Sequence, residues 1–159
     1  MTSLETGMFY VKQIVNMDTY SKKVEIRWSD LDPNFHVLHS KYYDFGAYCR
    51  MSFLTEHGMS AAMMMENNIG PIIFREECIF KREIKFGDEV EIFLKLRKCN
   101  EDASRWSMLH ELWTNGNTLA AIINIDGAWI DTKIRKLAIP PEICRTGMKL
   151  VPHTEDFNQ

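Results

Sequence analysis

One short stretch concentrates the residues that could carry chemistry. Between residues 28 and 45 the chain reads WSDLDPNFHVLHSKYYDF, which holds acids, a proline and two histidines. Asp32 follows a strand-like run, and His39 lies seven residues later, where a helix-like run begins. A helix start presents unpaired N–H groups and the positive end of the peptide dipole, so it can polarise a carbonyl. A carboxylate beside it can act as a general base on water or as a nucleophile. The pair therefore suits acyl-transfer chemistry.

Two other interpretations of the same stretch remain open. Asp, Pro and Asn in this order also favour a tight turn with side-chain capping. Alternatively, Asp32, His36 and His39, at spacings of four and three residues, could ligate zinc or iron. No further ligand is evident in the sequence, and Pro33 interrupts a helical register. Whichever holds, Asn34 and the two histidines could orient water, a substrate or the carboxylate.

The elements on either side follow from hydrophobic spacing. Residues 22–28, KKVEIRW, alternate between apolar and charged side chains, with Trp28 on the apolar face, which predicts a half-buried strand. Residues 40–57 have apolar side chains on most sides, which predicts a helix enclosed by other structure. Ser40 is a suitable residue to cap this helix, and Gly58 to end it.

The rest of the chain predicts a sheet. SAAMMMENN favours a short second helix, TNGN is a strong hairpin signal, and IPPEI favours a short terminal helix. The order of strand, long helix, short helix and then strands predicts an α+β fold. We expect a curved antiparallel sheet of five to six strands wrapped round one long helix. The later strands are predicted at residues 71–86, 90–96, 106–112 and 119–131.

Length and composition limit the possible classes of protein. With 159 residues, 45% of them hydrophobic and 26% charged, the chain suits one globular domain. We expect its core at about residues 22–145 and a flexible tail from about residue 153. A net charge of -3 argues against a general nucleic-acid binder. The four cysteines form no C-x-x-C pair, so no zinc knuckle or redox motif is indicated. Neither a signal peptide nor a membrane span is apparent, which predicts a cytoplasmic protein.

The stretch from residue 28 to 45 resembles the signature of hotdog-fold acyl-CoA thioesterases, specifically the 4-hydroxybenzoyl-CoA thioesterase branch. The shared pattern is a strand ending in an aromatic residue, then D-x-D-P, a short loop, and a helix start followed by aromatic residues. FKREIKFGDEVEI and IDTKIRKLAIPPEI are also similar to later parts of the family and occur in the right order. The resemblance covers about residues 22–145 and implies a single hotdog domain.

The resemblance also implies roles for particular residues. The family's catalytic carboxylate falls on Asp32, and its helix-start amide, which polarises the thioester carbonyl, falls on His39. In one sub-branch that position is also a catalytic histidine. The sub-branch has a tyrosine where this chain has Trp28, so its hydroxyl is missing. Many members read G-H-V-N-N where this chain has FHVLH at residues 35–39. The residues expected to bind the substrate are Trp28, Asn34, His36 and Tyr42.

The ligands and assembly implied by the resemblance can be stated in the same way. Relatives bind the nucleotide of coenzyme A outside the sheet through basic residues, for which Arg97, Lys98 and Arg105 are the candidates here. No metal or prosthetic group is required, because coenzyme A is part of the substrate. The family's active site lies between subunits, which implies a homodimer whose paired strands form a continuous sheet. Tetramers are also common among relatives.

The sequence therefore favours an enzyme that hydrolyses acyl-CoA thioesters to a free acid and coenzyme A. A related enzyme acting on acyl carrier protein thioesters is one alternative, and a non-catalytic acyl-binding hotdog module is another.

Two polar residues of predicted strands need separate explanations. Glu76 interrupts an apolar pattern, which indicates a bulge, a strand at the rim of the sheet or an acid of a second type of active site. His110 is in phase with apolar residues, which favours a core or interface histidine.

Overall fold

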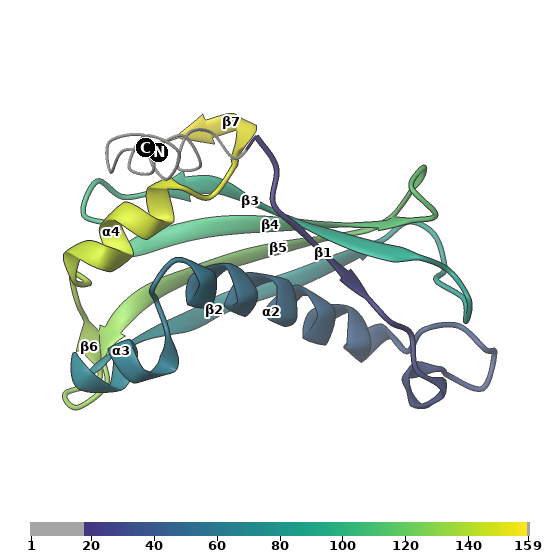
Figure 1. Cartoon of the computed structure of the whole chain (residues 1–159), viewed down its shortest axis with the longest axis horizontal. Coiled ribbons are helices and arrows are strands. Elements are labelled where there is room, and N and C mark those ends of the chain that lie inside the picture. Colours follow the sequence, from purple (N-terminus) through teal and green to yellow (C-terminus); the bar gives the residue numbers. More distant parts are fainter. Residues whose placement is uncertain (1–17, 159) are drawn as a thin grey trace, which may run out of the picture.

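The computed structural model describes residues 18–158 of the chain (Figure 1). A long helix lies on the concave side of a curved sheet, and the shorter helices lie at one end of it. Within the described residues no helix is both long and apolar enough to cross a lipid bilayer. In chain order the elements are β1 (Ser21–Val24), a 3-10 turn η1 (Trp28–Asp30), α2 (His39–Glu56), α3 (Ala61–Glu66), β2 (Ile69–Phe80), β3 (Val90–Cys99), β4 (Arg105–Thr114), β5 (Thr118–Asp131), β6 (Lys136–Leu137), α4 (Glu142–Lys149) and β7 (His153–Asn158).

The sheet has the architecture that the sequence predicts. Over residues 18–158 its main path runs β1-β3-β4-β5-β2, with every neighbouring pair antiparallel. The two-residue strand β6 adds to β5, and β7 lies parallel to β3, which brings the sheet to seven strands. The expected five- to six-stranded sheet round one helix is therefore confirmed in its main path, with short additions at the rim.

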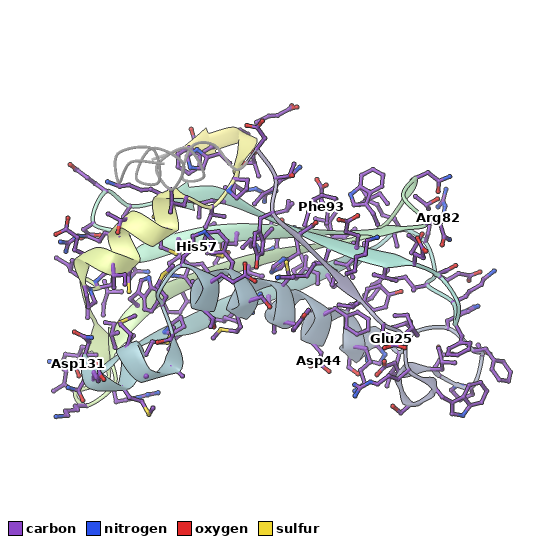
Figure 2. All side chains as sticks on the ribbon, viewed as in Figure 1. Glu25, Asp44, His57, Arg82, Phe93 and Asp131 are labelled. Carbon is purple, nitrogen blue, oxygen red and sulfur yellow. The ribbon has the colours of Figure 1, made fainter. Side chains whose placement is uncertain are left out.

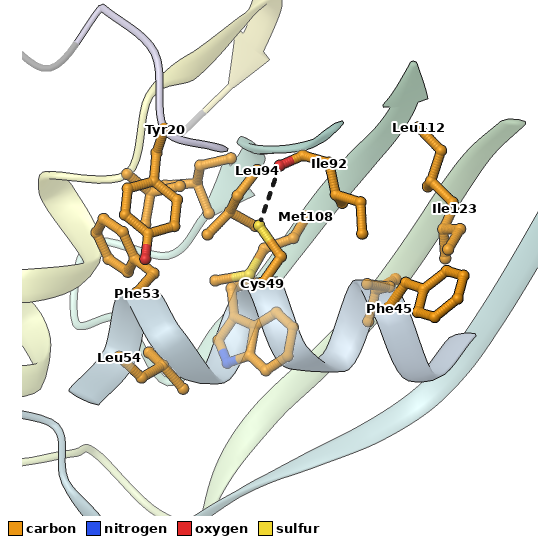
Figure 3. Packing of buried hydrophobic residues seen from close by; sticks show 14 of the residues in the cluster. Tyr20, Phe45, Cys49, Phe53, Leu54, Ile92, Leu94, Met108, Leu112 and Ile123 are labelled. Atoms are coloured by element: carbon orange, nitrogen blue, oxygen red, sulfur yellow. Dashed lines mark hydrogen bonds between the residues drawn. The ribbon is translucent and has the colours of Figure 1, made fainter. Parts of the chain in front are cut away.

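Helix α2 is held in place by its apolar face. Phe45, Cys49 and Phe53 point from α2 into the sheet, and Figure 3 shows them among Leu94 and neighbouring residues. The thiol of Cys49 donates a hydrogen bond to a carbonyl of β3, at 3.4 Å. Burying an apolar side chain of this size contributes about 1.5–3 kcal/mol, so this face accounts for much of the attachment of α2. Gly46 lies so close to the sheet that a Cβ there would meet His110 at 3.2 Å.

The C-terminal end of α2 agrees with the end predicted from the sequence, and the N-terminal end differs. At the C-terminal end, Gly58 adopts a left-handed φ of +83°, the conformation that glycine provides most readily. At the N-terminal end the prediction that Ser40 caps the helix is wrong. The helix begins one residue earlier, at His39, and its N-cap is Leu38, which makes no side-chain capping hydrogen bond. The first N–H groups of α2 are therefore free of a side-chain cap.

The predicted first strand is too long. It ends at Val24, and Trp28 starts the turn η1 instead of facing the core. The buried carboxylate of Asp30 explains this, because it accepts a hydrogen bond from the backbone N–H of Arg27 at 2.9 Å and so closes the turn. As a result the side chain of Trp28 is 68% exposed.

The predicted long strand at residues 71–86 also ends early. Strand β2 stops at Phe80, and the N–H groups of Lys81 and Arg82 both donate to the carbonyl of Ala120. The chain then crosses to the start of α2, where the fully buried Ile84 accepts a hydrogen bond from the N–H of Val37. The apolar residues after Phe80, such as Ile84, are therefore buried by contact with the start of α2 and not as part of a continuous β2.

The C-terminal residues differ from the predicted flexible tail. His153–Asn158 form β7, whose approach to β3 is marked by a hydrogen bond from the N–H of Leu96 to the carbonyl of Pro152, at 2.7 Å. Phe157 is partly buried against the core. One apolar side chain in a polar segment gives no alternating pattern, so the sequence does not reveal this strand.

Candidate active site

A pocket of about 360 Å³ lies at the end of the molecule where α2 begins. Figure 2 places Arg82, which lines the pocket, at this end with Asp44 and Glu25, while Asp131 lies at the opposite end. The structure brings four of the predicted site residues together here, and adds the segment that follows β2. The lining consists of Asp32, His36, Val37, His39, Tyr42, Phe80, Lys81, Arg82 and Glu83.

Asp32 is held in a defined position by one of its two carboxylate oxygens. Its Oδ1 accepts hydrogen bonds from the backbone N–H of Asn34, at 2.8 Å, and of His36, at 3.1 Å. The turn interpretation of this stretch is therefore correct as a description of geometry. Its other oxygen, Oδ2, accepts no hydrogen bond from any described residue. The turn thus fixes the carboxylate and leaves one oxygen available, so a structural role and a chemical role coexist in Asp32.

The loop that carries Asp32 is closed like a small hairpin. The N–H of Asp32 donates to the carbonyl of His36 at 2.8 Å, and the N–H of Leu38 donates to the carbonyl of Asp30, also at 2.8 Å. Phe35, at the tip, has a left-handed φ of +64°. This conformation is unfavourable for a bulky residue such as phenylalanine and typically costs about 1–3 kcal/mol. The closed loop fixes the distance between the carboxylate and the start of α2.

Asp30 anchors the same loop from inside the protein. Its side chain is fully buried, and its carboxylate contacts the side chains of Arg27, at 3.4 Å, and Lys41, at 3.9 Å. Burial alone would raise the pKa of Asp30. The hydrogen bonds from the Arg27 backbone and guanidinium, together with the charge of Lys41, outweigh burial and hold the pKa below its usual value. The first acid of the D-x-D motif is therefore a structural carboxylate, and the second faces the pocket.

The helix start provides the other half of the chemistry. His39 is the first residue of α2 and is exposed. Two residues later, the backbone N–H of Lys41 donates to the carbonyl of Leu38. Since no side chain caps this terminus, its foremost N–H groups can interact with an oxyanion or a carbonyl in the pocket. Asp32 and this helix start line the same pocket, as the sequence predicted.

Two further predicted residues also lie in the pocket. Tyr42 is almost fully buried and its ring meets that of Phe80 edge to face, with centroids 4.9 Å apart. Burial raises the pKa of the Tyr42 hydroxyl, which therefore stays protonated and able to donate. The Nε2 atom of His36 lies 3.4 Å from the carboxylate of Glu83, across the pocket lining. The pocket lining thus combines the aromatic rings of Tyr42 and Phe80 with the polar side chains of His36 and Glu83.

Two predicted substrate-binding residues do not line this pocket. Trp28 packs against Phe35 and Phe86, with ring centroids 5.9 and 6.1 Å away, on the outside of the loop. Asn34 is exposed, and its contribution is the backbone N–H that holds Asp32. The prediction that Trp28 binds the substrate rested on the family resemblance, and the η1 turn places this side chain outside the pocket.

Residues that follow β2 also line this pocket, and the sequence did not predict them beside Asp32. Lys81 and Arg82 bring positive charge and Glu83 brings a carboxylate, while Phe80 closes the apolar side. These residues were assigned to a continuous strand, because apolar residues on alternate positions extend past Phe80. Strand β2 ends at Phe80 because the next two N–H groups donate to the carbonyl of Ala120. The local sequence pattern does not predict these hydrogen bonds.

A second, smaller pocket of about 190 Å³ holds two of the three predicted phosphate-binding residues. Lys98 and Arg105 line it with Asn100 and Ser107, and the Arg105 guanidinium lies 5.5 Å from the centroid of the Phe74 ring. Arg97 does not line this pocket, and its Nε atom is buried without a hydrogen-bond partner among the described residues. The basic cluster is thus narrower than the sequence indicated.

The metal-ligand interpretation gains no support from the arrangement of side chains. Over the part of the chain that the structure describes, no group of three or more His, Cys, Asp and Glu residues is placed to hold a metal ion. Asp32 directs Oδ1 to backbone N–H groups, and His36 directs Nε2 to Glu83.

A curved antiparallel sheet wrapped round one long helix defines the hotdog fold. The comparison with protein families agrees: the chain belongs to the thioesterase-like superfamily, whose model matches residues 26–146. The protein is accordingly a thioester hydrolase. No curated protein matches the sequence.

Solved structures show the same fold. A hypothetical protein from Staphylococcus aureus, solved in complex with coenzyme A, superposes with a TM-score of 0.79 at 16% identity, over 89% of this chain and 87% of its own. A 1,4-dihydroxy-2-naphthoyl-CoA thioesterase from Synechocystis has a TM-score of 0.75 at 16% identity, over 86% and 99%. A DHNA-CoA thioesterase from Staphylococcus aureus has a TM-score of 0.69 at 17% identity, over 76% and 80%. At these identities the likeness concerns the fold.

Proposed function

We propose that the protein hydrolyses acyl-CoA thioesters, with Asp32 as the general base or nucleophile. The observation that supports this most directly is the shared pocket, in which the Asp32 carboxylate and the uncapped start of α2 face the same space. The thioester carbonyl oxygen would accept hydrogen bonds from the helix-start N–H groups, including that of His39. Negative charge that develops on this oxygen would be stabilised by those N–H groups and the helix dipole.

The side chain of Asp32 suits both possible roles. One oxygen is fixed by the turn, and Oδ2 remains available to take a proton from water or to attack the carbonyl. The exposed side chain of His39 would support the water or Asp32, and Tyr42 could donate from its buried hydroxyl. His36 lies opposite Glu83, where it would orient the substrate.

Basic residues at both pockets could bind the phosphate groups of coenzyme A. Lys81 and Arg82 stand at the first pocket, and Lys98 and Arg105 at the second, where they would meet phosphate groups. Arg105 already stacks on Phe74, which limits its conformations. Relatives solved with coenzyme A agree with this choice of carrier.

Replacement of Asp32 by Asn tests the proposal. Asn preserves the acceptor oxygen that holds the turn, so the fold should be retained while the base or nucleophile is lost. We expect kcat/KM for acyl-CoA hydrolysis to fall by a factor of about 10² to 10⁴. His39→Ala should reduce it less, because the backbone N–H of residue 39 remains.

The matched control is Asp44→Asn, which removes an exposed acid of α2 outside the pocket and should leave the rate unchanged. The screen should include short, long and aromatic acyl-CoA thioesters. An unchanged rate in Asp32→Asn would remove this residue from the mechanism. A single turnover in water enriched in ¹⁸O separates its two possible roles, since label in Asp32 would identify a nucleophile.

The same screen addresses the two alternatives. A carrier-protein enzyme would prefer acyl groups on acyl carrier protein, whose acidic surface could meet Lys81 and Arg82 at the pocket. A binding module would retain acyl-CoA tightly without turnover. We favour the coenzyme A thioesterase because the second basic pocket suits a compact polyphosphate nucleotide.

A further inference from the structure

A buried polar cluster lies away from the pocket and takes no part in the proposed hydrolysis. Arg50 of α2 is only 7% exposed, yet it carries a guanidinium group. Its Nη1 atom lies 3.0 Å from Nε2 of His110 on β4, and its Nη2 atom lies 3.7 Å from the carboxylate of Glu76 on β2. An arginine in such a position needs an explanation, because burying a charge is unfavourable unless the charge is well paired.

The pairing of Arg50 is incomplete. His110 is fully buried, and its Nδ1 atom lies 3.2 Å from the carbonyl of Phe93, so Nδ1 donates and Nε2 accepts from Arg50. Burial, and then the charge of Arg50, lower the pKa of His110 to about 3, so the imidazole is neutral and offers no negative charge. Among the described residues, only Glu76 has a carboxylate within ion-pair distance, and 3.7 Å exceeds hydrogen-bonding range. A guanidinium with five N–H donors is therefore underused.

The cluster lies at a fixed distance from the pocket along two elements. Arg50 follows Tyr42 by eight residues, which corresponds to about 12 Å along α2. Glu76 precedes Phe80 by four residues, which corresponds to about 13 Å along β2. Because Tyr42 contacts Phe80 and Arg50 contacts Glu76, the two elements lie alongside each other over this length. We refer to the boundary between these two contacts as the α2–β2 seam.

Small side chains occupy the middle of the α2–β2 seam. Ala47 lies three residues before Arg50, on the same face of the helix, and Cys78 shares the inner face of β2 with Glu76 and Phe80. Both are half-buried. Larger residues flank the seam at either end, and at the pocket end the Phe80 side chain is 50% exposed, so its ring can turn aside. An acyl group whose thioester lies at the helix start could extend along the seam toward Arg50.

On the basis of the proposed acyl-CoA hydrolysis, we propose that Arg50 determines specificity by binding a carboxylate at the far end of the acyl group. The preferred substrates would then be ω-carboxyacyl-CoA thioesters of medium length. An extended eight-carbon acyl group spans about 9 Å, which matches the seam once the length of the arginine side chain is included. The Glu76 side chain is 23% exposed, so it can turn toward solvent when the substrate carboxylate replaces it. A planar guanidinium then pairs with the substrate in bidentate geometry.

Binding measurements in the Asp32→Asn background test the inference without requiring turnover. Suberyl-CoA and octanoyl-CoA differ by the terminal carboxylate and have the same number of carbons. We expect calorimetry to show that suberyl-CoA binds at least about tenfold more tightly, as a charge-assisted hydrogen bond in a buried site would provide. Adding Arg50→Met should abolish this preference, and adding Glu76→Gln should increase it because the competing carboxylate is gone.

Two further variants control for folding and net charge. The combination of Arg50→Met and Glu76→Gln leaves no unpaired charge in the seam, so it should fold even if Arg50→Met alone does not. It should lose the preference for suberyl-CoA. Lys133→Met removes an exposed positive charge from the turn after β5 and should keep the wild-type preference.

The possible results separate the inference from the proposed function. Equal affinity for the two ligands, no binding of either, or an equal loss for both in Arg50→Met would overturn the role of Arg50. A clear preference for suberyl-CoA in a protein whose wild-type form hydrolyses no thioester would instead contradict the proposed hydrolysis and leave Arg50 as a binding residue.

Discussion

At the scale of single residues, His110 shows how burial determines the chemical state of a side chain. It donates to the carbonyl of Phe93 and accepts from Arg50, so both ring nitrogens are used by the neutral form. Protonation would place two positive charges side by side in the core. The lowered pKa of about 3 follows first from burial and second from the guanidinium of Arg50.

This state makes stability depend on pH in a predictable direction. In the unfolded chain a histidine takes up a proton below about pH 6.5, whereas folded His110 does not until about pH 3. Unfolding is therefore favoured as pH falls below about 6.5. The contribution amounts to about 2 kcal/mol of lost stability between pH 7 and pH 5. We expect His110→Gln, which keeps an acceptor for Arg50, to show a loss smaller by about this amount.

Urea unfolding at pH 7 and pH 5 measures the difference. His153→Gln, at an exposed position in β7, is the control and should follow the wild type. If His110→Gln and the wild type lost equal stability between the two pH values, His110 would not be the group that remains neutral in the fold.

At the scale of elements, the sequence predicted where helices and strands occur better than where they end. The long helix and the later strands follow from apolar spacing, which depends on the solvent exposure of each face. The end of β1 depends on the buried acceptor Asp30, and the end of β2 on the carbonyl of Ala120. Neither the burial of Asp30 nor the position of Ala120 on a later strand follows from the local apolar pattern, so the boundaries were predicted several residues too late.

The candidate site divides in the same way. Asp32, His36, His39 and Tyr42 could be found from the sequence because they lie in one stretch, whose loop and helix start bring them together. The lining that follows β2 could not be found, because it reaches the pocket only after the chain leaves the sheet. Trp28 was misplaced for a related reason: its side depended on a strand that ends before it.

Gly127 provides a test of how closely the strands of the sheet must approach. Strand β2 has a bulge between Ile73 and Arg75, opposite this glycine on β5. A Cβ at residue 127 would lie 2.4 Å from the ring of Trp106 and 2.5 Å from the carbonyl oxygen of Ile72. Since backbone cannot move aside easily, we expect Gly127→Ala to destabilise the protein by about 3 kcal/mol or more.

Denaturant unfolding would measure this loss, with Gly70→Ala on β2 as the comparison. There a Cβ would meet only a methyl group of Thr132, at 3.2 Å, so a smaller loss is expected. Similar stabilities for the two variants would show that β2 and β5 can separate at the bulge without loss of packing.

At the scale of the whole molecule, the exposed edge of β2 is the feature that matters for assembly. Within residues 18–158, β2 is paired with β5 on one side and with no strand on the other. Ile79 and Phe80 on this strand are 42% and 50% exposed. A long unpaired strand edge of this kind is a template for pairing with another chain. A homodimer through β2, or a tetramer built from such dimers, is therefore the assembly that we expect.

Antiparallel pairing of β2 with its copy would also join the two pockets. The Phe80 end of β2 borders the pocket with Asp32, and Phe74 lines the pocket with Lys98 and Arg105. These ends lie about 20 Å apart on one strand, by its rise per residue. A two-fold axis passing near Glu77 would place Phe80 of one protomer beside Phe74 of its partner. One protomer would then supply the carboxylate, and its partner the basic residues for coenzyme A.

Mixed dimers distinguish a site built across the boundary from one built within a chain. Asp32→Asn and Arg105→Met homodimers should both hydrolyse acyl-CoA poorly at low substrate concentration. In a dimer of one chain of each kind, a shared site would combine both defects on one side and leave the other side intact. We therefore expect co-expressed and separated mixed particles, with the mass of two 18.6 kDa chains by light scattering, to regain activity. If each site belonged to one chain, every site would carry a defect, and the mixed particles would show only the average of the two parents.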